Sequence, residues 1–442
     1  MDRQIIKNVL DLRKLCVGCG ACISLCPHNA VYLKFENDDV VPWVDEKRCI
    51  KCGICISFCP ITQLYQVKEL SIPVLIGKVK AVFFGYSSNS YIRYHGASGG
   101  IATCLLLYML DKGIVDKVLV TRFSRLLPKS EITNNKEVIL DAQGSIYFKG
   151  FTLTNLRLLM DEVKKGKRVA IVGLPCQIHV LRKLFRKKLD YILFIGLVCN
   201  HVIDLWYLEY VVMRFLKNSR RILHLKPRRN GWPGSINIIF EDFSGHVIEK
   251  KIPLISFWSY LCKLGVNAPL GCFLCLDHLA TEADVVLGDG WHPKFYGNKD
   301  GVSLIIVRSE RLLELIKECD NQGVLHLFPA SISDMLLAQG YHIINTILYM
   351  PLINMYKPLL LESQSQNLIR YSTATWTISF FISLFSICIK RLISVHKSLR
   401  KIIYTPSVAI LLSLVNKLIY LEARKMRNKL IFNLSRNDYN IF

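Results

Sequence analysis

Four apolar runs in the middle of the chain predict strands that are buried on both faces. Each is an almost unbroken series of aliphatic side chains, and together they occupy residues 168–173, 191–197, 284–288 and 303–308. Strands of this kind belong to sheets that helices cover on both sides. Helical patterns at 99–110 and 154–165, the second followed by Gly166, precede them. We therefore predict an α/β domain with a mixed, largely parallel sheet.

A different pattern occupies residues 235–252. Polar and apolar positions there flank Phe243, Ser244 and Gly245, which is typical of an antiparallel hairpin. Together with composition, the patterns divide the chain into three regions. These are a cysteine-rich α+β head (1–70), the α/β domain (71–330) and a basic, apolar tail (331–442) that we expect to be helical.

The composition adds a question about metal and one about charge. Of 442 residues 16 are cysteine, and the formal net charge is +23. The N-terminal residues are charged and do not resemble a secretory signal, so we expect a cytoplasmic protein with reduced thiols, most of which need a metal. The positive charge favours an acidic partner, such as a nucleic acid, an anionic membrane surface or a phosphorylated cofactor. Because the sequence has no nucleic-acid recognition motif, we predict no nucleic-acid partner.

Two segments of the head, 16–27 and 49–60, repeat the spacing C-x2-C-x2-C-x3-C-P. In this spacing three thiolates hold one 4Fe-4S cluster and the fourth reaches the other cluster, so that the two sites interlock. Gly18, Gly20 and Gly53 allow tight turns that point N–H groups at the sulfurs. The predicted ligands are Cys16, Cys19, Cys22 and Cys59 for one cluster, and Cys49, Cys52, Cys55 and Cys26 for the other.

Zinc is the alternative metal for these thiols. A zinc site normally takes four ligands as two pairs, and eight cysteines in this order fit it poorly. The head resembles a bacterial two-cluster ferredoxin, which carries single electrons and performs no substrate chemistry itself. Its partner would be a redox protein or a soluble electron carrier.

Four further cysteines lie in the α/β domain. Cys176 directly follows one predicted strand and Cys199 the next, so both emerge at the sheet edge where α/β proteins bind ligands. Cys272 and Cys275 form a C-x2-C, bringing the thiolates to the four that a third cluster needs. The alternative is two core cysteines and an incidental C-x2-C. The cysteines interpreted as structural are Cys104, Cys262, Cys319 and Cys388.

Short motifs occur in a fixed order between residues 81 and 308. They are Ala97-Ser98-Gly99-Gly100, Gly144-Ser145-Ile146-Tyr147, Leu174-Pro175-Cys176-Gln177, Leu197-Val198-Cys199, Gly231-Trp232-Pro233, the segment 272–278, Glu282-Ala283-Asp284 and Gly288-Asp289-Gly290-Trp291. Taken together they resemble the beta subunit of coenzyme F(420) hydrogenases and dehydrogenases, a family that includes chlorophyll-related reductases and other iron-sulfur flavoproteins. The resemblance implies a third cluster on Cys176, Cys199, Cys272 and Cys275, with FAD bound beside it.

The resemblance also implies residues that contact the flavin. Ser98, Gly99 and Gly100 begin a predicted helix. Free N–H groups and the helix dipole at a helix N-terminus attract a pyrophosphate, although a Ser-Gly-Gly sequence is by itself usually only a helix start. Trp291, His278 and His292 lie near the same motifs, but a turn Asp with a packed Trp and structural histidines are the alternatives, and no catalytic residue is assigned. The family often has lysine where this chain has Ile146. The predicted cofactor contacts are Ser98, Gly99, Gly100, Ser145, Tyr147, Gln177, Asn200 and Asp289.

The tail combines an uncharged stretch with a basic one. Residues 371–389 carry no charge, and residues 390–436 contain eleven Lys or Arg against Glu422 alone. Because Ser and Thr interrupt the apolar stretch, contact with an anionic membrane surface at its inner face fits at least as well as a spanning helix. The alternatives are a packed helical subdomain and a partner-docking face.

Three functions fit these features. The first is an FAD and iron-sulfur oxidoreductase, linked to coenzyme F(420) or ferredoxin, that exchanges two electrons with a hydride carrier or organic substrate and single electrons through three clusters. The second is a non-catalytic electron-transfer subunit that feeds a partner enzyme. The third is a membrane-docked protein of cell-surface polysaccharide biosynthesis, which the domain arrangement and the tail suggest. We favour the first, because no cluster ligand is missing.

Overall fold

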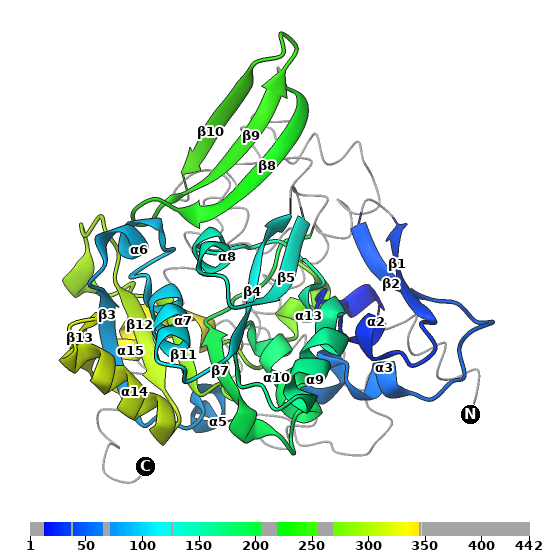
Figure 1. Cartoon of the computed structure of the whole chain (residues 1–442), viewed down its shortest axis with the longest axis horizontal. Helices are drawn as coiled ribbons and strands as arrows, with labels where there is room; N and C mark the ends of the chain where they lie inside the picture. The colour runs from blue at the N-terminus through cyan, green and yellow to red at the C-terminus, as the bar shows by residue number, and fades with distance from the viewer. Residues whose placement is uncertain are drawn as a thin grey trace, which may run out of the picture.

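The computed structural model describes residues 13–36, 39–64, 71–124, 127–204, 219–253, 268–343 and 346. Figure 1 shows a small N-terminal head, drawn in blue, beside a larger α/β body from which a separate sheet projects. The predictions for 371–436, and for Cys262 and Cys388, lie outside the described residues. Within them, no helix has the length and apolarity needed to cross a membrane.

The head consists of short helices and one hairpin. Strands β1 and β2 pair antiparallel, and the residue before each of α2 and α3 is a left-handed glycine, Gly20 (φ 86°) or Gly53 (φ 74°). Only glycine takes that conformation without strain, which explains its place in both cysteine motifs. The elements are η1 (Arg13–Leu15), α2 (Ala21–Leu25), β1 (Val31–Glu36), β2 (Asp39–Val44), α3 (Ile54–Ser57) and α4 (Pro60–Leu64).

The body is built on a sheet of eight strands: β3 (Ala81–Ser87), β4 (Lys117–Ser124), β5 (Leu127–Thr133), β6 (Val169–Gly173), β7 (Ile192–Leu197), β11 (Val285–Asp289), β12 (Ser303–Val307) and β13 (Leu325–Ala330). Their order is β13-β3-β12-β11-β7-β6-β4-β5. The central strands β11, β7, β6 and β4 are parallel, and the outer pairs are antiparallel. The predicted mixed α/β fold with a largely parallel centre is confirmed.

Alternate residues of the central strands face two different cores, which explains the unbroken apolar runs. In β6, Val169 and Ile171 belong to one core and Ala170 to the other. Helices α9 (Leu156–Lys164), α10 (Pro175–Leu184) and α15 (Ile332–Gln339) contribute to the first core, and α7 (Ile101–Asp111), α8 (Lys136–Asp141) and α14 (Glu310–Asn321) to the second. Each buried aliphatic side chain stabilises the fold by about 1.5–3 kcal/mol.

The remaining elements refine the predictions. The predicted hairpin at 235–252 is present as β9 (Ser235–Asp242) and β10 (Val247–Pro253), joined by a third antiparallel strand, β8 (Ser219–Arg229). The helix predicted at 154–165 begins as a 3-10 turn, η2 (Thr152–Asn155), before α9. The other short helices are α5 (Ile72–Ile76), α6 (Ser90–His95), η3 (Leu189–Tyr191), α13 (Leu270–Phe273) and η4 (Pro293–Phe295).

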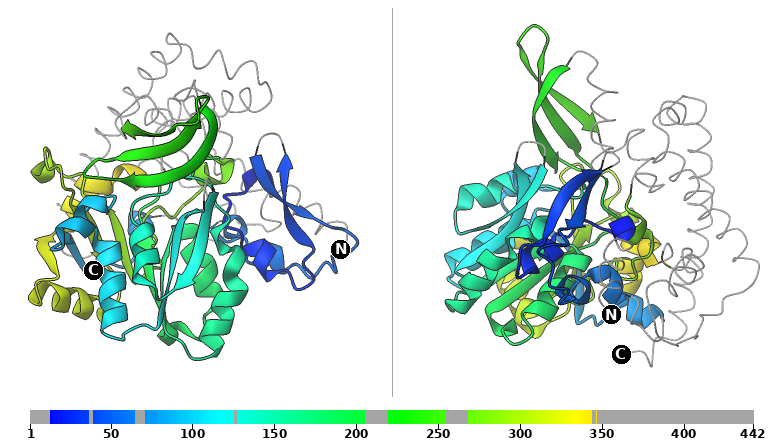
Figure 2. Two further views of the ribbon diagram at one scale, coloured as in Figure 1. Left: turned by 45° about the horizontal axis from the view of Figure 1, so that its top comes forward. Right: turned by 90° about the vertical axis from the view of Figure 1, so that its right-hand side faces the viewer.

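The head lies beside the body (Figure 2), and hydrogen bonds join the two. The N–H of Phe151 donates to Gly18 O and that of Leu153 to Cys19 O, both at 2.8 Å. From α9, Arg157 Nε donates to Ser24 O at 2.8 Å. Cys19 and Ala21 of the head belong to the same core as α9 and α10. The first cysteine motif is therefore held against the start of α9 and the segment that leads into it.

Candidate cluster and cofactor sites

The first group of thiols gathers around α2. Burial, and then the charges of Cys19 and Cys16, raise the pKa of Cys22 well above its ordinary value. Burial also raises the pKa of Cys59 to about 12, with Cys16 among its neighbours. Thiols in such surroundings stay protonated unless a metal offsets the charge of the thiolates. Cys16, Cys19, Cys22 and Cys59, which we call the inner site, thus lie together.

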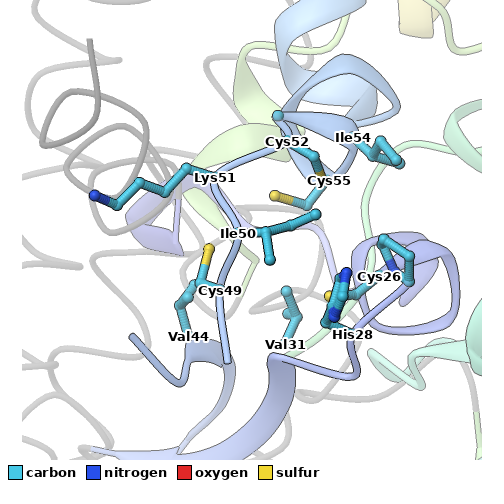
Figure 3. A pocket seen from close by; sticks show the side chains of 12 residues that line it. Cys26, His28, Val31, Val44, Cys49, Ile50, Lys51, Cys52, Ile54 and Cys55 are labelled. Carbon is cyan, nitrogen blue, oxygen red and sulfur yellow. The ribbon is translucent and has the colours of Figure 1, made fainter. Parts of the chain in front are cut away.

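The second group lines a pocket at the outer end of the head. Figure 3 shows Cys26, Cys49, Cys52 and Cys55 around it, beside Val31 and Val44. Burial raises the pKa of Cys55 to about 11, and the charges of the other three thiols add to the effect. The side chain of Cys52 is exposed. These four cysteines form the outer site, which is open to solvent.

The third group comes from three separate parts of the body. Cys176 lies in the first turn of α10 directly after β6, and Cys199 follows β7. Because β6 and β7 are parallel neighbours, their carboxyl ends meet at the same edge of the sheet. The N–H of Cys199 donates to His278 O at 3.0 Å, which ties it to the loop that carries Cys272 and Cys275.

The electrostatics agree with this grouping. Burial, and then the charge of Cys272, raise the pKa of Cys199. Burial raises the pKa of Cys176 well above its ordinary value, with Cys199, Cys275 and Cys272 among the charges that add to it. The fold therefore brings together the four thiols that the resemblance selected, which we call the body site.

The three sites follow one another in a row. Cys22 and Cys59 of the inner site are each close enough to Cys55 of the outer site to be influenced by its charge. At the other end, Cys19 is the first charge that raises the pKa of Cys176. Among the described residues, no group of three or more His, Cys, Asp or Glu is spaced for a single metal ion. A 4Fe-4S cluster, with four irons among its thiolates, needs a wider set.

A buried arginine organises the other predicted residues beside the body site. Arg228, at the end of β8, is 2% exposed, and its Nη2 donates to Asp289 Oδ1 and Oδ2 at 2.8 and 3.0 Å. The same nitrogen donates to Ala97 O at 2.7 Å. Trp232 Nε1 donates to Asp289 Oδ1 at 3.2 Å. Burial disfavours the guanidinium charge, but Asp289 keeps the pKa of Arg228 above its usual value.

Two more predicted contacts lie against this arginine. Ser145 exchanges backbone hydrogen bonds with Arg228, N to O at 3.1 Å and O to N at 3.0 Å. The Arg228 guanidinium lies 5.8 Å from the centre of the Tyr147 ring. Its Nε is buried and makes no hydrogen bond to the described residues. Arg228 is not among the residues predicted from the sequence, although it lies three residues before the Gly231-Trp232-Pro233 motif.

The predicted phosphate loop has a structural role in this fold. Ser98 Oγ donates to Val302 O at 2.6 Å, and the Gly99 N–H donates to Ser303 Oγ at 2.9 Å. A Cβ on Gly99 would stand 2.4 Å from Gly85 O. Gly100, with φ 76°, precedes the first turn of α7. These contacts hold α7 on the sheet, and a phosphate contact at the loop stays a prediction.

Of the remaining candidates, Gln177 caps a helix, whereas Asn200 and His278 lie beside Cys199 of the body site. Gln177 accepts from the Leu174 N–H at 2.8 Å and donates to Thr152 Oγ1 at 2.5 Å, so its amide caps α10. Asn200 is half-buried directly after Cys199. His278 Nδ1 lies 2.8 Å from Cys199 O, and burial lowers its pKa.

Two aromatic candidates, Trp291 and His292, lie just after β11. His292 is buried, with its Nε2 3.3 Å from Asp334 Oδ1, and burial lowers its pKa. The Trp291 ring lies 4.2 Å from that of Trp232. Trp291 therefore packs beside the Arg228 group, whereas His292 faces α15.

Comparison with known proteins assigns most of the chain to family models. The N-terminal part of the coenzyme F(420) hydrogenase/dehydrogenase beta subunit matches residues 82–157, and its C-terminal part matches residues 166–332. A 4Fe-4S dicluster domain matches residues 15–63. The body and the head are thus matched separately.

Individual relatives are identical to this chain at about a quarter of the aligned residues. The coenzyme F(420)-dependent sulfite reductase of Methanocaldococcus jannaschii is 27% identical over 67% of this chain and 44% of its own, so the chain spans less than half of that protein. One subunit of the F(420)H(2) dehydrogenase of Methanosarcina mazei is 26% identical over 65% of this chain and 80% of its own. A chain of the F(420)-reducing NiFe hydrogenase complex of Methanosarcina barkeri has a TM-score of 0.48 and 20% identity, over 66% of this chain and 96% of its own.

Proposed function

Because the chain belongs to the family of coenzyme F(420) hydrogenase/dehydrogenase beta subunits and carries a 4Fe-4S dicluster domain, we propose that it is an iron-sulfur flavoprotein oxidoreductase. It would exchange two electrons with a hydride carrier or organic substrate at FAD, and single electrons through three 4Fe-4S clusters. The observation that carries the proposal is the series of three thiol sites, in which the inner site links the body site to the outer site with its exposed Cys52.

The donor set fits iron-sulfur clusters at all three positions. Each site groups four thiols, and N–H groups point at some of their sulfurs, as from Gly18 to Cys16 Sγ (3.4 Å) and from Ala30 to Cys26 Sγ (3.2 Å). Such hydrogen bonds stabilise the reduced cluster. The inner and outer sites would hold the two ferredoxin-type clusters, and the body site the third.

The residues around Arg228 fit an anionic, aromatic ligand such as FAD. The buried Nε is a donor available to a ligand, and the Tyr147 ring lies beside the guanidinium. Bound FAD would supply the exchange between a two-electron hydride step and one-electron transfer. Asp289 fixes the orientation of Arg228, and Ala97 O positions it next to the start of α7. Asp289 ends β11, which runs parallel to β7, and α/β proteins bind ligands at the carboxyl ends of such strands.

Coenzyme F(420) is one candidate for the hydride carrier. The sulfite reductase relative is named for dependence on this coenzyme, and the dehydrogenase relative for its reduced form. We propose that the present chain also uses coenzyme F(420) as its hydride carrier, with an organic substrate as the alternative.

A second candidate function is an electron-transfer subunit that feeds a partner enzyme. The exposed outer site favours it, because electrons that reach Cys52 can leave the protein there. The polysaccharide hypothesis depends on the basic part of the tail (371–436), which lies outside the described residues.

Anaerobic purification followed by iron, sulfide and flavin quantitation tests the proposal. We expect about twelve irons per chain, the content of three cubanes, and about one FAD. Turnover with reduced coenzyme F(420) and a one-electron acceptor would favour the enzyme over the electron-transfer subunit. About eight irons and no flavin would reject the flavin and body-site assignments.

The outer site is bordered by basic side chains, which suits an acidic one-electron carrier. Lys47 and Arg48 are exposed, Lys51 is half-buried, and Ile50 is 58% exposed. We expect the double variant Lys47→Glu/Arg48→Glu to slow electron transfer to an acidic ferredoxin about tenfold at low salt, because electrostatic steering is reversed. At about 1 M salt, where the Debye length is only about 3 Å, the difference should disappear.

Stopped-flow mixing of the reduced protein with oxidised ferredoxin measures this rate. The matched control is Lys164→Glu/Lys165→Glu, which changes the charge equally on two exposed residues at the C-terminal end of α9. Equal slowing of both variants, or none at the outer site, would contradict docking at this rim.

A further inference from the structure

A buried ion pair lies where the head meets the body, and neither the cluster ligands nor the flavin contacts account for it. The Lys149 side chain is 2% exposed and that of Asp204 is 10% exposed, with Nζ 3.5 Å from Oδ1. Removing two charges from water costs free energy that their attraction only partly returns. An apolar pair would fill this space at less cost, so the presence of two charges needs an explanation.

The position of Lys149 provides one. Its stem lies directly against Gly18 in the loop between Cys16 and Cys19, since a Cβ on Gly18 would stand 2.0 Å from Lys149 Cγ. The N–H of Phe151, two residues on, donates to Gly18 O at 2.8 Å. The loop of the inner site and the stem of Lys149 are therefore in contact along the backbone.

The other side of the pair belongs to the body. The Lys149 N–H donates to Ile203 O at 2.8 Å, which places it beside the segment that leads from Cys199 to Asp204. Within the inner site, Cys19 is the thiol whose charge reaches Cys176 of the body site. The ion pair thus lies at the junction that electrons cross between head and body.

We propose that Lys149 sets the reduction potential of the inner cluster, with Asp204 as the charge that moderates it. Reduction adds one negative charge to the cluster, and a fixed cation in a medium of low dielectric constant stabilises the product. Lys149 therefore raises the potential of the inner cluster and Asp204 lowers it. The balance between these two charges decides whether the inner cluster passes electrons between the clusters of the body and outer sites or retains them. This inference rests on the proposed cluster at Cys16, Cys19, Cys22 and Cys59.

Opposite shifts distinguish this role from simple packing. Lys149→Met keeps most of the stem and removes the charge, so one of three reduction midpoints should become more negative. Asp204→Asn keeps the shape and removes the moderating charge, so the same midpoint should become more positive. The double variant should return towards the original value. Potentiometric titration of the anaerobically purified whole protein, followed by EPR, measures all three.

The matched control is Lys183→Met. Lys183 also donates to the head, to Ser57 O at 2.5 Å, but it is half-buried. Solvent therefore screens its charge, and the midpoint of the inner cluster should barely move.

Shifts of the same sign in the two single variants, or no shift in a protein with full iron content, would overturn the inference. If Lys149→Met fails to fold, the sign of the Asp204→Asn shift still decides. Fewer than about eight irons in the unaltered protein would instead reject the ferredoxin clusters themselves.

Discussion

Replacing Cys176 by Ala is expected to remove about four of about twelve irons per chain, while leaving two ferredoxin-type EPR signals. The pKa of Cys176 is raised by the charges of the other thiols of the body site and by that of Cys19 of the inner site. Its loss leaves three thiolates for the third cluster, and the inner and outer ligands stay intact. Electrons supplied as hydride should then no longer reach the head, whereas dithionite should still reduce it.

Iron and sulfide analysis with EPR of the dithionite-reduced protein measures this effect. Cys104→Ala is the control, since Cys104 is buried in α7 and its Sγ donates to Val324 O at 3.6 Å. It should leave the iron content unchanged. Loss of every signal in the Cys176 variant, or of none, would show that Cys176 is not a ligand of a separate third cluster.

Replacing Arg228 by Met should abolish flavin binding and destabilise the body by about 3 kcal/mol. Breaking a buried ion pair by removing one partner costs about 3–5 kcal/mol, and the lower end applies because the Asp289 side chain is 17% exposed. Flavin is lost because the variant has no cation beside Tyr147 and no donor at the position of Nε. Flavin content after gel filtration and thermal unfolding under anaerobic conditions measure both effects.

A second variant separates stability from ligand binding. In Arg228→Met/Asp289→Leu the unpaired carboxylate is gone, so most of the lost stability should return, while flavin binding should stay absent. Arg228→Lys keeps the charge without the planar fork and should bind flavin weakly. About one FAD per chain in the Arg228→Met protein would contradict the role of this arginine.

The two cysteine motifs show how much spacing alone can predict. The order of the cysteines between residues 16 and 59 predicts interlocked groups, and the thiols that neighbour one another in the fold are those of the two predicted groups. Short loops leave few geometries for closely spaced ligands. The assignment of a metal to these groups stays a prediction.

The apolar runs were equally informative about the sheet. Residues 169–173 and 192–197 form neighbouring parallel strands, because an unbroken aliphatic run is stable only where helices cover both faces. The edge strands β5 and β13 were not predicted, since they mix polar and apolar residues and resemble surface segments.

The sequence by itself determined four buried strands of the sheet, the hairpin at 235–252 and the local cysteine groups, because periodicity and spacing act over a few residues. Only the tertiary structure decided that the charge of Cys19 influences the pKa of Cys176, that Arg228 pairs with Asp289, and that Lys149 packs against Gly18. Each of these contacts joins residues more than 60 positions apart. Such contacts depend on the packing of head, sheet and hairpin in three dimensions, which no local pattern records.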